Sequence, residues 1–336
     1  MWKMIGTAVQ GRSHLKHDIP VQDKVFHLSD KVNVIALADG AGSAKLSHFG
    51  AQTVVETICH ALNEHFDYLF ALEQITDAQT FIIEQLLDVL HQLADFHNEE
   101  VNEFASTLLC VAIKNEKVLI FHLGDGEIGA MKDGELVSIS SASNGEYANA
   151  TYFVTSSQAS SRLKIFKSSN SKKFTSYFLL SDGTAASFYS KQQNKFSDII
   201  KKICLQSKFT SETEMNAMLE ESFEQFVKQR TSDDCSFVAM TAVNNNENVY
   251  ISLSEEERKY LLSSFSELKH CSIKKLDSIV FHLAKPLTLK QLGKIMYIKP
   301  KYIKQAINLL KSLGIVVLKK QKYHLTFEGT YDEYNK

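Results

Sequence analysis

The chain has 336 residues, with 37 basic and 39 acidic side chains, so its formal net charge at pH 7 is −2. This length allows one large hydrophobic core and a smaller module, which predicts two domains. The sequence has no run of about 18 uncharged apolar residues and no secretory signal at its N-terminus, which argues against a membrane protein and predicts a cytoplasmic one.

Short β-rich runs, many of them closed by Gly, Asp or Asn, predict strands in the first part of the chain. They lie at residues 5–10, 32–37, 106–113, 117–123, 135–139, 151–154, 176–180 and 236–241. Apolar residues at helical spacing predict helices at 47–66, 78–97, 196–204 and 212–228. Strands and helices do not alternate regularly, which favours an α+β fold with antiparallel sheets. Residues 156–173 are rich in Ser, Lys and Asn and predict a mobile loop, with a flap over a site as its functional interpretation.

The charge is unevenly distributed along the chain. Residues 1–250 carry 21 basic and 31 acidic side chains, whereas residues 251–336 carry 16 and 8. Helical patterns at 255–265, 273–283, 288–293 and 300–313 precede strand-like runs at 315–318 and 323–326. This order predicts a small winged helix-turn-helix domain at 253–330, joined by a linker at 244–252 to a domain at 1–243.

Lysines lie on or beside the predicted recognition helix and wing of this second domain: Lys299, Lys301, Lys304, Lys311, Lys319, Lys320 and Lys322. Such a footprint suits contacts to a DNA backbone. It also suits a solvated lysine face on a module that docks a regulatory protein. No arginine follows Arg258, so bidentate guanine recognition by arginine is not available. The sequence leaves both DNA and a regulatory protein as candidate partners, with protein docking preferred.

Four acidic motifs stand at the ends of predicted strands. They are Ala38-Asp39-Gly40-Ala41-Gly42, Gly124-Asp125-Gly126, Ser181-Asp182-Gly183 and Ser232-Asp233-Asp234. Each motif alone is also an ordinary turn signal. Mg²⁺ and Mn²⁺ prefer oxygen ligands, so carboxylates from the rims of separate strands can converge on such ions. Four motifs in one domain therefore predict a metal site.

The order of these motifs resembles the PPM-type, or type 2C, serine/threonine protein phosphatases, in particular their bacterial branch. The resemblance spans about residues 6–243. It also includes the run from Gly11-Arg12-Ser13-His14 to Gln22-Asp23 and the small-residue strand Ala105-Ser106-Thr107-Leu108. It implies a sandwich of two antiparallel β-sheets flanked by helices (α-β-β-α), with metal ions at one end.

The resemblance also implies the roles of the acidic residues. Asp39 would bridge two Mn²⁺ or Mg²⁺ ions and Gly40 would offer its carbonyl, while Asp182 and Asp233 would bind the first ion. Asp125 would help to hold a third, weaker ion. The pair Gln22-Asp23 stands where many members have an acidic pair, so both residues would belong to the metal site. Gln22 takes the place of a Glu that reaches the second metal through water, and with one charge fewer it would weaken that site.

The implied chemistry is direct hydrolysis of phosphoserine or phosphothreonine in a protein substrate that a partner kinase has phosphorylated. Two divalent ions about 3.5–4 Å apart can lower the pKa of a bridging water and stabilise an in-line displacement, without a protein nucleophile. This interpretation makes Asp39, Asp182 and Asp233 the catalytic residues.

Two positions depart from the family pattern. Ala41 replaces the histidine that eukaryotic members have as a candidate general acid, and Asp18 replaces the phosphate-binding arginine. Arg12, His14 or Lys16 could substitute, and Arg12 is preferred because its fork suits phosphate. These departures leave two other hypotheses: a catalytically silent phosphatase-like sensor, and a DNA-binding regulator whose output is the C-terminal domain.

Residues 144–149 read either as a plain turn or as the base of the flap. In the second interpretation Tyr147 and Asn149 contact the substrate.

Overall fold

The computed structural model describes residues 1–141, 151–243, 253–263, 273–312 and 315–325, and the chain divides into two compact units. The larger unit comprises Trp2–Ile200 and Thr213–Thr241. The smaller unit comprises Met1, Lys201–Glu212 and Ala242–Lys336. The domain division predicted at 243 and 253 stays a prediction. Tyr147 and Asn149 lie outside the described residues.

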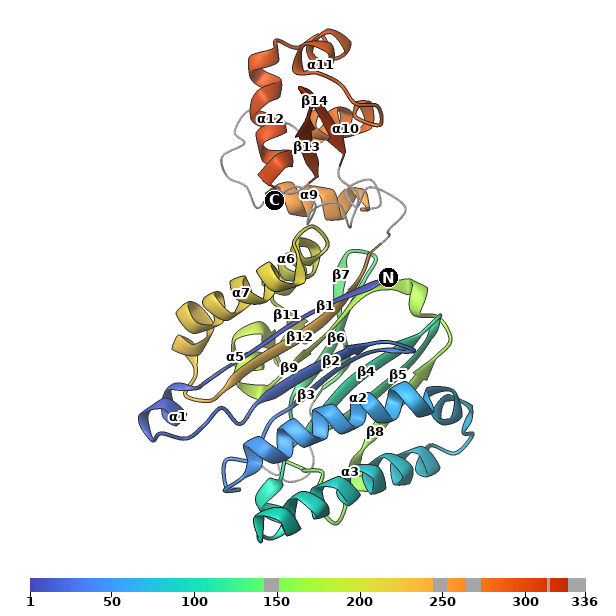
Figure 1. Ribbon diagram of the computed structural model, residues 1–336, viewed down its shortest axis with the longest axis vertical. Helices are drawn as coiled ribbons and strands as arrows, with labels where there is room; N and C mark the ends of the chain where they lie inside the picture. Colours follow the sequence, from blue (N-terminus) through green and yellow to red (C-terminus); the bar gives the residue numbers. More distant parts are fainter. Residues whose placement is uncertain (142–150, 244–252, 264–272, 313–314, 326–336) are drawn as a thin grey trace. The chain divides into compact units, whose positions relative to one another are not determined.

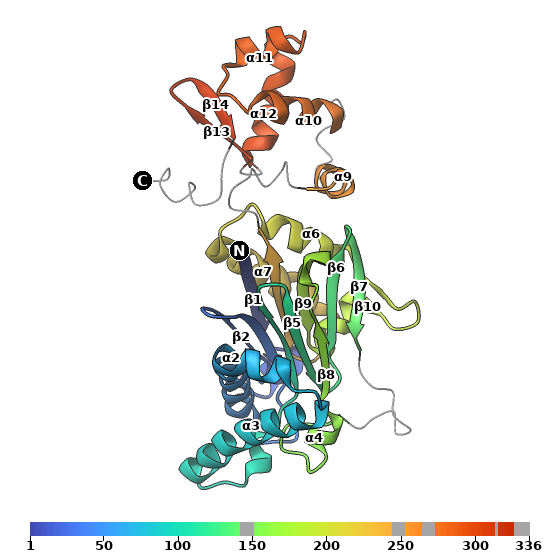
Figure 2. The same cartoon turned by 90° about the vertical axis from the view of Figure 1, so that its right-hand side faces the viewer.

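Two five-stranded sheets form the centre of the larger unit (Figures 1 and 2). One has the order β1-β12-β9-β6-β7 and the other β2-β3-β4-β5-β8. Their strands are β1 (Trp2–Val9), β12 (Cys235–Ala242), β9 (Phe174–Leu180), β6 (Glu127–Lys132), β7 (Glu135–Ser140), β2 (Lys24–Ser29), β3 (Asn33–Ala38), β4 (Leu108–Lys114), β5 (Lys117–Leu123) and β8 (Lys164–Ser168). The pairings within the second sheet are antiparallel, as are those of β12 with β9, β9 with β6 and β6 with β7. The predicted α+β class with antiparallel sheets is confirmed.

Strand β3 shows how the sequence builds two apolar layers at once. Successive side chains of a strand point to opposite faces of the sheet. Val34 and Ala36 belong to the core cluster shared with the helices, whereas Ile35 and Leu37 belong to the cluster between the two sheets. A strand buried on both faces therefore reads as a continuous apolar run, which made this strand easy to predict.

Helices cover the outer faces of both sheets. α2 (Ser47–Ala71) and α3 (Ile75–His97) lie over the sheet that contains β3 (Figure 1). On the other sheet, Phe223 in the π-helical turn η3 (Phe223–Val227) packs against Phe237 and Phe188, with ring centroids 6.2 and 5.8 Å apart. The α-β-β-α arrangement is thus present.

The remaining elements are short. They are α1 (Arg12–Lys16), η1 (Val101–Phe104), α4 (Ala159–Arg162), η2 (Ser171–Lys173), α5 (Asp182–Phe188), β10 (Tyr189–Ser190), β11 (Lys195–Phe196), α6 (Asp198–Ser207), α7 (Glu212–Ser222) and η4 (Lys228–Arg230).

The loop predicted at residues 156–173 is wrong in part, because α4, β8 and η2 lie inside it. β8 pairs antiparallel with β5 at the edge of its sheet. Edge strands often carry lysines, and Lys164 and Lys167 gave this strand the composition of a loop. The strand predicted at 151–154 is also wrong, since these residues form no ladder, although the Val154 amide donates to the Ser106 carbonyl at 2.8 Å.

The smaller unit contains α9 (Glu255–Ser263), α10 (Ile273–His282), α11 (Leu289–Ile295), α12 (Pro300–Ser312), β13 (Val316–Lys319) and β14 (Lys322–Leu325). A capping box between Thr288 and Gln291 begins α11, and β13 pairs antiparallel with β14. A bridge between Leu287 and Tyr323 joins the entry of α11 to this hairpin. The described helices and hairpin follow the predicted order, and their assignment as a winged helix-turn-helix stays a prediction.

Residues 201–212 belong to the smaller unit although they lie far from its other residues in sequence. Lys208 and Glu257, both buried, form an ion pair at 3.4 Å. The Lys201 ammonium lies 4.9 Å from the centre of the Tyr260 ring. These two contacts connect the segment to α9.

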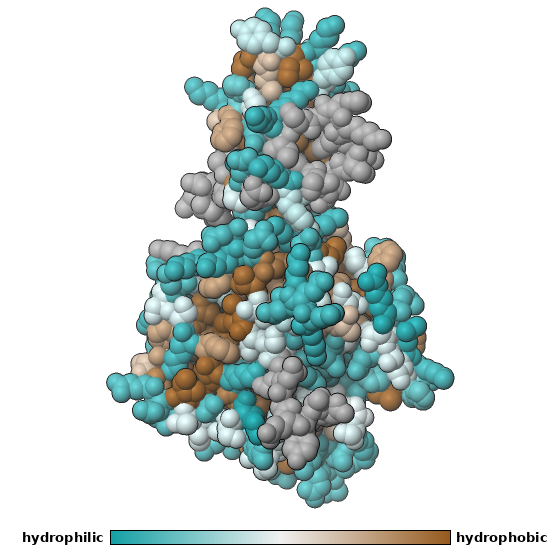
Figure 3. Space-filling model, turned by 180° about the vertical axis from the view of Figure 1, so that it is seen from behind, coloured by the Kyte–Doolittle hydropathy of each residue, from teal (hydrophilic) through white to brown (hydrophobic). Residues whose placement is uncertain are grey.

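Hydrophilic side chains cover much of the face of the larger unit drawn in Figure 3, with apolar side chains gathered in one part of it. Among the described residues, no helix combines the length and the apolar character that a bilayer crossing requires.

Candidate metal centre

The four acidic motifs lie where strands of the larger unit end or begin. Asp39 follows β3, Asp125 lies between β5 and β6, Asp182 begins α5 directly after β9, and Asp233 precedes β12. β9 lies between β12 and β6, and β4 lies between β3 and β5. Each sheet therefore brings motifs that are distant in sequence to the same rim.

Three of these carboxylates meet. Asp39, Asp125 and Asp182 each offer an oxygen, and these oxygens all lie within 4.8 Å of one another. Asp233 is not in this group of three, but its charge acts on both Asp39 and Asp182. The structure thus brings together three predicted ligands and places the fourth beside them.

The proximity of like charges changes the acidity of the cluster. Burial, followed by the charges of Asp23, Asp182, Asp233 and Asp125, raises the pKa of Asp39 well above its usual value. Burial and then Asp125 and Asp233 raise the pKa of Asp182. Both effects disfavour the ionised carboxylates, which a nearby cation would favour.

Asp23 extends the cluster below the surface. Its side chain is 1% exposed, and burial together with the charge of Asp234 raises its pKa to about 7. The hydroxyls of Ser181 and Ser236 act in the opposite direction. Near pH 7, this carboxyl is therefore partly protonated.

Several buried oxygens of this region have no hydrogen-bond partner among the described residues. They are Oδ1 of Asp182, Oδ2 of Asp23 and Oε1 of Gln22. A buried polar atom without a partner is costly, and hard divalent cations take carboxylate and amide oxygens as ligands. This donor set, oxygen only and rich in negative charge, fits Mn²⁺ or Mg²⁺.

Hydroxyl groups hold the ligands in place. Thr107 Oγ1 accepts a hydrogen bond from the Asp39 amide at 2.8 Å, and the Thr107 amide donates to the Asp39 carbonyl at 2.8 Å. Thr151 donates to Asp125, and Gln22 Nε2 donates to Ser47 Oγ at 2.7 Å.

Sequence reasoning found only the first of these supporting residues. Thr107 belongs to a motif shared with the phosphatase family. Ser47 and Thr151 are single hydroxyl residues far from their partners in sequence, and no local pattern marks them.

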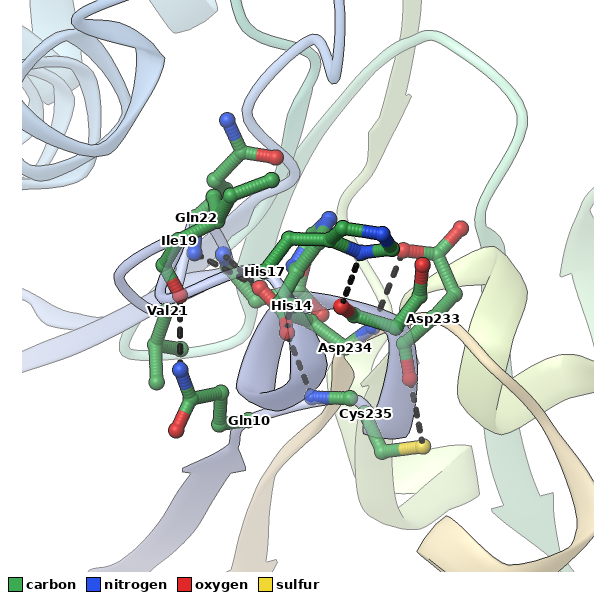
Figure 4. Close-up of polar contacts among 12 residues, drawn as sticks. Gln10, His14, His17, Ile19, Val21, Gln22, Asp233, Asp234 and Cys235 are labelled. Atoms are coloured by element: carbon green, nitrogen blue, oxygen red, sulfur yellow. Dashed lines mark hydrogen bonds and ion pairs between the residues drawn. The ribbon is translucent and has the colours of Figure 1, made fainter.

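Asp234 organises the N-terminal turn. Its carboxylate, which is buried, accepts hydrogen bonds from the Gly11 amide at 2.6 Å, the Gln22 amide at 2.6 Å and His14 Nδ1 at 2.8 Å (Figure 4). Two of its neighbours are thus predicted site residues. A side chain at position 11 would place its Cβ 2.3 Å from the Asp233 carbonyl carbon, so this approach requires glycine.

The two residues predicted to bind phosphate lie on α1, beside the same turn. Arg12 is exposed, and its Nε donates to the Thr231 carbonyl at 3.0 Å. His14 is held by Asp234. The structure therefore brings both side chains to the segment that carries Asp233.

The fold and this acidic centre together define a metal-dependent phosphatase. Residues 10–224 match a family model described as protein phosphatase 2C, which is more than half of the chain. A curated relative, serine/threonine-protein phosphatase 3 of Escherichia coli (strain K12), is 29% identical over 179 residues, 50% of this chain and 68% of the relative.

Two solved structures share the fold. One, an S. agalactiae serine/threonine phosphatase, covers 72% of this chain and all of its own, with 13% identity and a TM-score of 0.50. The other, a C. elegans sex determining protein, covers 71% of this chain and 64% of its own, with 14% identity and a TM-score of 0.52.

The match over residues 10–224 settles the family: the chain belongs to the protein phosphatase 2C family. It is a protein serine/threonine phosphatase, and phosphatases of this family use Mn²⁺ or Mg²⁺, which agrees with the acidic cluster. The predicted family, enzyme class and metal cofactor are confirmed.

Proposed function

We propose that this protein hydrolyses phosphoserine and phosphothreonine in protein substrates by direct attack of water, without a covalent phosphoenzyme. The observation that carries the proposal is the convergence of Asp39, Asp125 and Asp182 within 4.8 Å at the rim of the sandwich. None of these carboxylates needs to act as a nucleophile, because the cluster is suited to holding cations.

The proposed ligand roles follow the acidic residues one by one. Asp39, with the Gly40 carbonyl, Asp182 and Asp233 hold the principal ions, and Asp125 helps to hold a third, weaker one. When bound, Mn²⁺ or Mg²⁺ lowers the pKa of water and neutralises charge on the phosphoryl oxygens. Asp23 and Gln22 are proposed to complete the metal site, and the buried oxygens Asp23 Oδ2 and Gln22 Oε1, without a hydrogen-bond partner among the described residues, support this.

Recognition of the substrate phosphate is proposed to fall to Arg12, with His14 as the alternative. The exposed guanidinium of Arg12 can donate two parallel hydrogen bonds to a phosphate. Its contact with the Thr231 carbonyl keeps it near Asp233. Ala41 has no proton to donate, so water or another group protonates the leaving alkoxide.

The domains at 1–243 and 253–330 are proposed to have different functions. The first carries catalysis, and the basic second domain directs or regulates it. A partner serine/threonine kinase in the cytoplasm would supply the phosphorylated substrate.

Hydrolysis of a phosphothreonine peptide and of p-nitrophenyl phosphate tests the proposal. The purified chain is assayed with EDTA, Mg²⁺ or Mn²⁺, next to the Asp182→Asn variant. We expect turnover that requires the metal and is lost in the variant. A folded protein that turns over neither compound with any metal would contradict the proposal and favour a silent phosphatase-like sensor.

A further inference from the structure

The smaller unit contains a long segment whose charge is of one sign. Residues 278–327 include ten lysines and no aspartate or glutamate. All ten belong to the described residues, and nine of them are exposed: Lys285, Lys290, Lys294, Lys299, Lys301, Lys304, Lys311, Lys320 and Lys322. Lysines in such number, without acidic neighbours in the segment, provide the electrostatic footprint of a protein that binds a polyanion.

Helix α12 has two distinct faces. Ile303, Ala306, Ile307 and Leu310 are fully buried in the smaller unit. Tyr302 is 48% exposed. The exposed polar side chains, at helical spacing, are Lys301, Lys304, Gln305, Asn308 and Lys311. Residues three and four apart share one face of a helix, so this set forms one polar surface with two amides between lysines.

The hairpin after α12 adds a second basic element. The turn between β13 and β14 contains Lys320 and Gln321, whose φ angles are 45° and 64°, and the strands pair Lys319 with Lys322. Two successive left-handed residues make a tight two-residue connection. The turn therefore presents Lys320 and Lys322 as an exposed tip.

We propose that α12 and the β13–β14 turn bind double-stranded DNA, with α12 in the major groove and the turn against the phosphate backbone. The major groove admits an α-helix, and lysines contact phosphates. The amides of Gln305 and Asn308 each offer one donor and one acceptor, which match N7 and N6 of adenine. This surface therefore suits sites rich in A·T pairs.

The exposed face of α12 favours DNA over a protein partner. A protein interface usually has an apolar centre inside a polar rim. Here the polar face holds the amides of Gln305 and Asn308 among lysines. The exposed ring of Tyr302 lies beside them, with the Lys301 ammonium 4.8 Å from its centre. The proposal does not depend on the catalytic function of the larger unit.

Fluorescence anisotropy tests whether the lysines contact DNA phosphates. The full chain is titrated with a duplex of about 20 base pairs of random sequence, at salt concentrations from about 50 to about 200 mM. We expect saturable binding that weakens steeply with salt. The Lys304→Gln/Lys311→Gln variant should reduce the slope of log K against log salt by about 2. Lys191→Gln/Lys195→Gln, two exposed lysines of the larger unit, is the matched control and should leave the slope unchanged.

The proposed recognition of adenine by Gln305 and Asn308 is tested with two duplexes, one rich in A·T pairs and one rich in G·C pairs. Gln305→Ala/Asn308→Ala should reduce the preference for the A·T-rich duplex by about tenfold or more, with the salt slope unchanged. Circular dichroism confirms that each variant is folded.

Three results would overturn the proposal: no duplex binding at low salt, binding that the α12 lysine variant leaves unchanged, or tighter binding to a single-stranded oligonucleotide. The last result would point to the exposed rings of Tyr297 and Tyr302 as stacking platforms. All variants are also assayed for phosphatase turnover, which should stay at the level of the unmodified chain, so failure of one function is distinguished from failure of the other.

Discussion

The acidic centre and the basic face of α12 concentrate charge in opposite ways. In the centre, oxygens of the partly exposed Asp39, Asp125 and Asp182 lie within 4.8 Å of one another, and burial contributes most to the raised pKa of Asp39. On α12, Lys301, Lys304 and Lys311 are exposed and spread along the helix. Both sets consist of like charges, but only the second is fully solvated.

This difference determines what each region requires. Buried like charges are poorly screened, so they shift their pKa values or bind a counter-ion. Exposed like charges keep their hydration and are screened over about 10 Å at 0.1 M salt. We therefore expect the first region to respond to metal and pH and the second to salt, and the predictions below test that separation.

The largest expected effect concerns catalysis. Asp39→Asn, Asp182→Asn and Asp233→Asn each remove one charge from the metal centre. We expect phosphatase activity to fall about a thousandfold or more, because metal ions contribute several kcal/mol of transition-state stabilisation. Initial rates with a phosphothreonine peptide at saturating Mn²⁺ measure the loss.

Asp88→Asn, an exposed position on α3, provides the control and should keep full activity. If all three variants of the centre turned over substrate at the rate of the control, the proposed assignment of the metal ligands would be wrong.

Metal removal should produce the next largest effect, on stability. A ligand that binds only the folded state at about 100 times its Kd stabilises it by about 2.7 kcal/mol, which corresponds to about 5–10 °C in Tm for a unit of this size. We expect Mn²⁺ to raise the Tm of the original chain by this amount relative to EDTA. Asp39→Asn should show a much smaller rise in differential scanning fluorimetry, and an equal rise would contradict metal binding at Asp39.

Asp23 should make the metal-free protein less stable at higher pH. The pKa of Asp23 is about 7 in the fold, above its ordinary value of 3.8, so the folded state binds the proton more tightly than the unfolded chain does. Its stabilising contribution is present at low pH and is lost as pH rises toward 7. Between pH 5.5 and 7.5 in EDTA, this loss should be on the order of 2 kcal/mol.

Urea unfolding of the original chain and of Asp23→Asn at the two pH values measures this effect. The variant should lose less stability than the original chain as pH rises. Equal losses would show that Asp23 does not carry the pH dependence.

The sequence was sufficient for β3 and α2 because their signals are local, whereas β2 and β6 were not among the predicted strands. The apolar run of β3 and the helical spacing of α2 each reflect burial of the residues themselves. The acidic motifs at Asp39, Asp125 and Asp182 combine a carboxylate, a glycine and the end of a strand. Their convergence could be predicted once the family resemblance supplied the order of the strands.

Other features that were missed from the sequence depend on partners that are distant along the chain. β8 is an edge strand with lysines, so its composition predicted a loop, and only its pairing with β5 identifies it as a strand. Thr151 and Ser47 support Asp125 and Gln22 through single hydroxyl groups. Asp234 contacts Gly11 and His14, more than 200 residues away, which no local pattern could indicate.

The smallest predicted effect comes from a buried histidine of β5, three residues before Asp125. His122 is 1% exposed, and its Nδ1 lies 2.6 Å from Ser140 Oγ. Burial, followed by the charge of Lys164, lowers the pKa of His122 to about 3. The folded state therefore keeps this imidazole neutral, while the unfolded chain takes up a proton near pH 6.5.

The stability that His122 contributes is fully present above about pH 6.5 and is lost as pH falls toward 3. From pH 7.5 to 5.5 its share of the loss should be on the order of 1 kcal/mol. His122→Gln should be less stable than the original chain at pH 7.5, because it disturbs the contact with Ser140, yet it should lose less on acidification. Urea midpoints measured with saturating Mg²⁺, which keeps the acidic centre out of the titration, separate the two effects. If both proteins lost the same amount between the two pH values, the neutral buried imidazole would not be the source of the acid sensitivity.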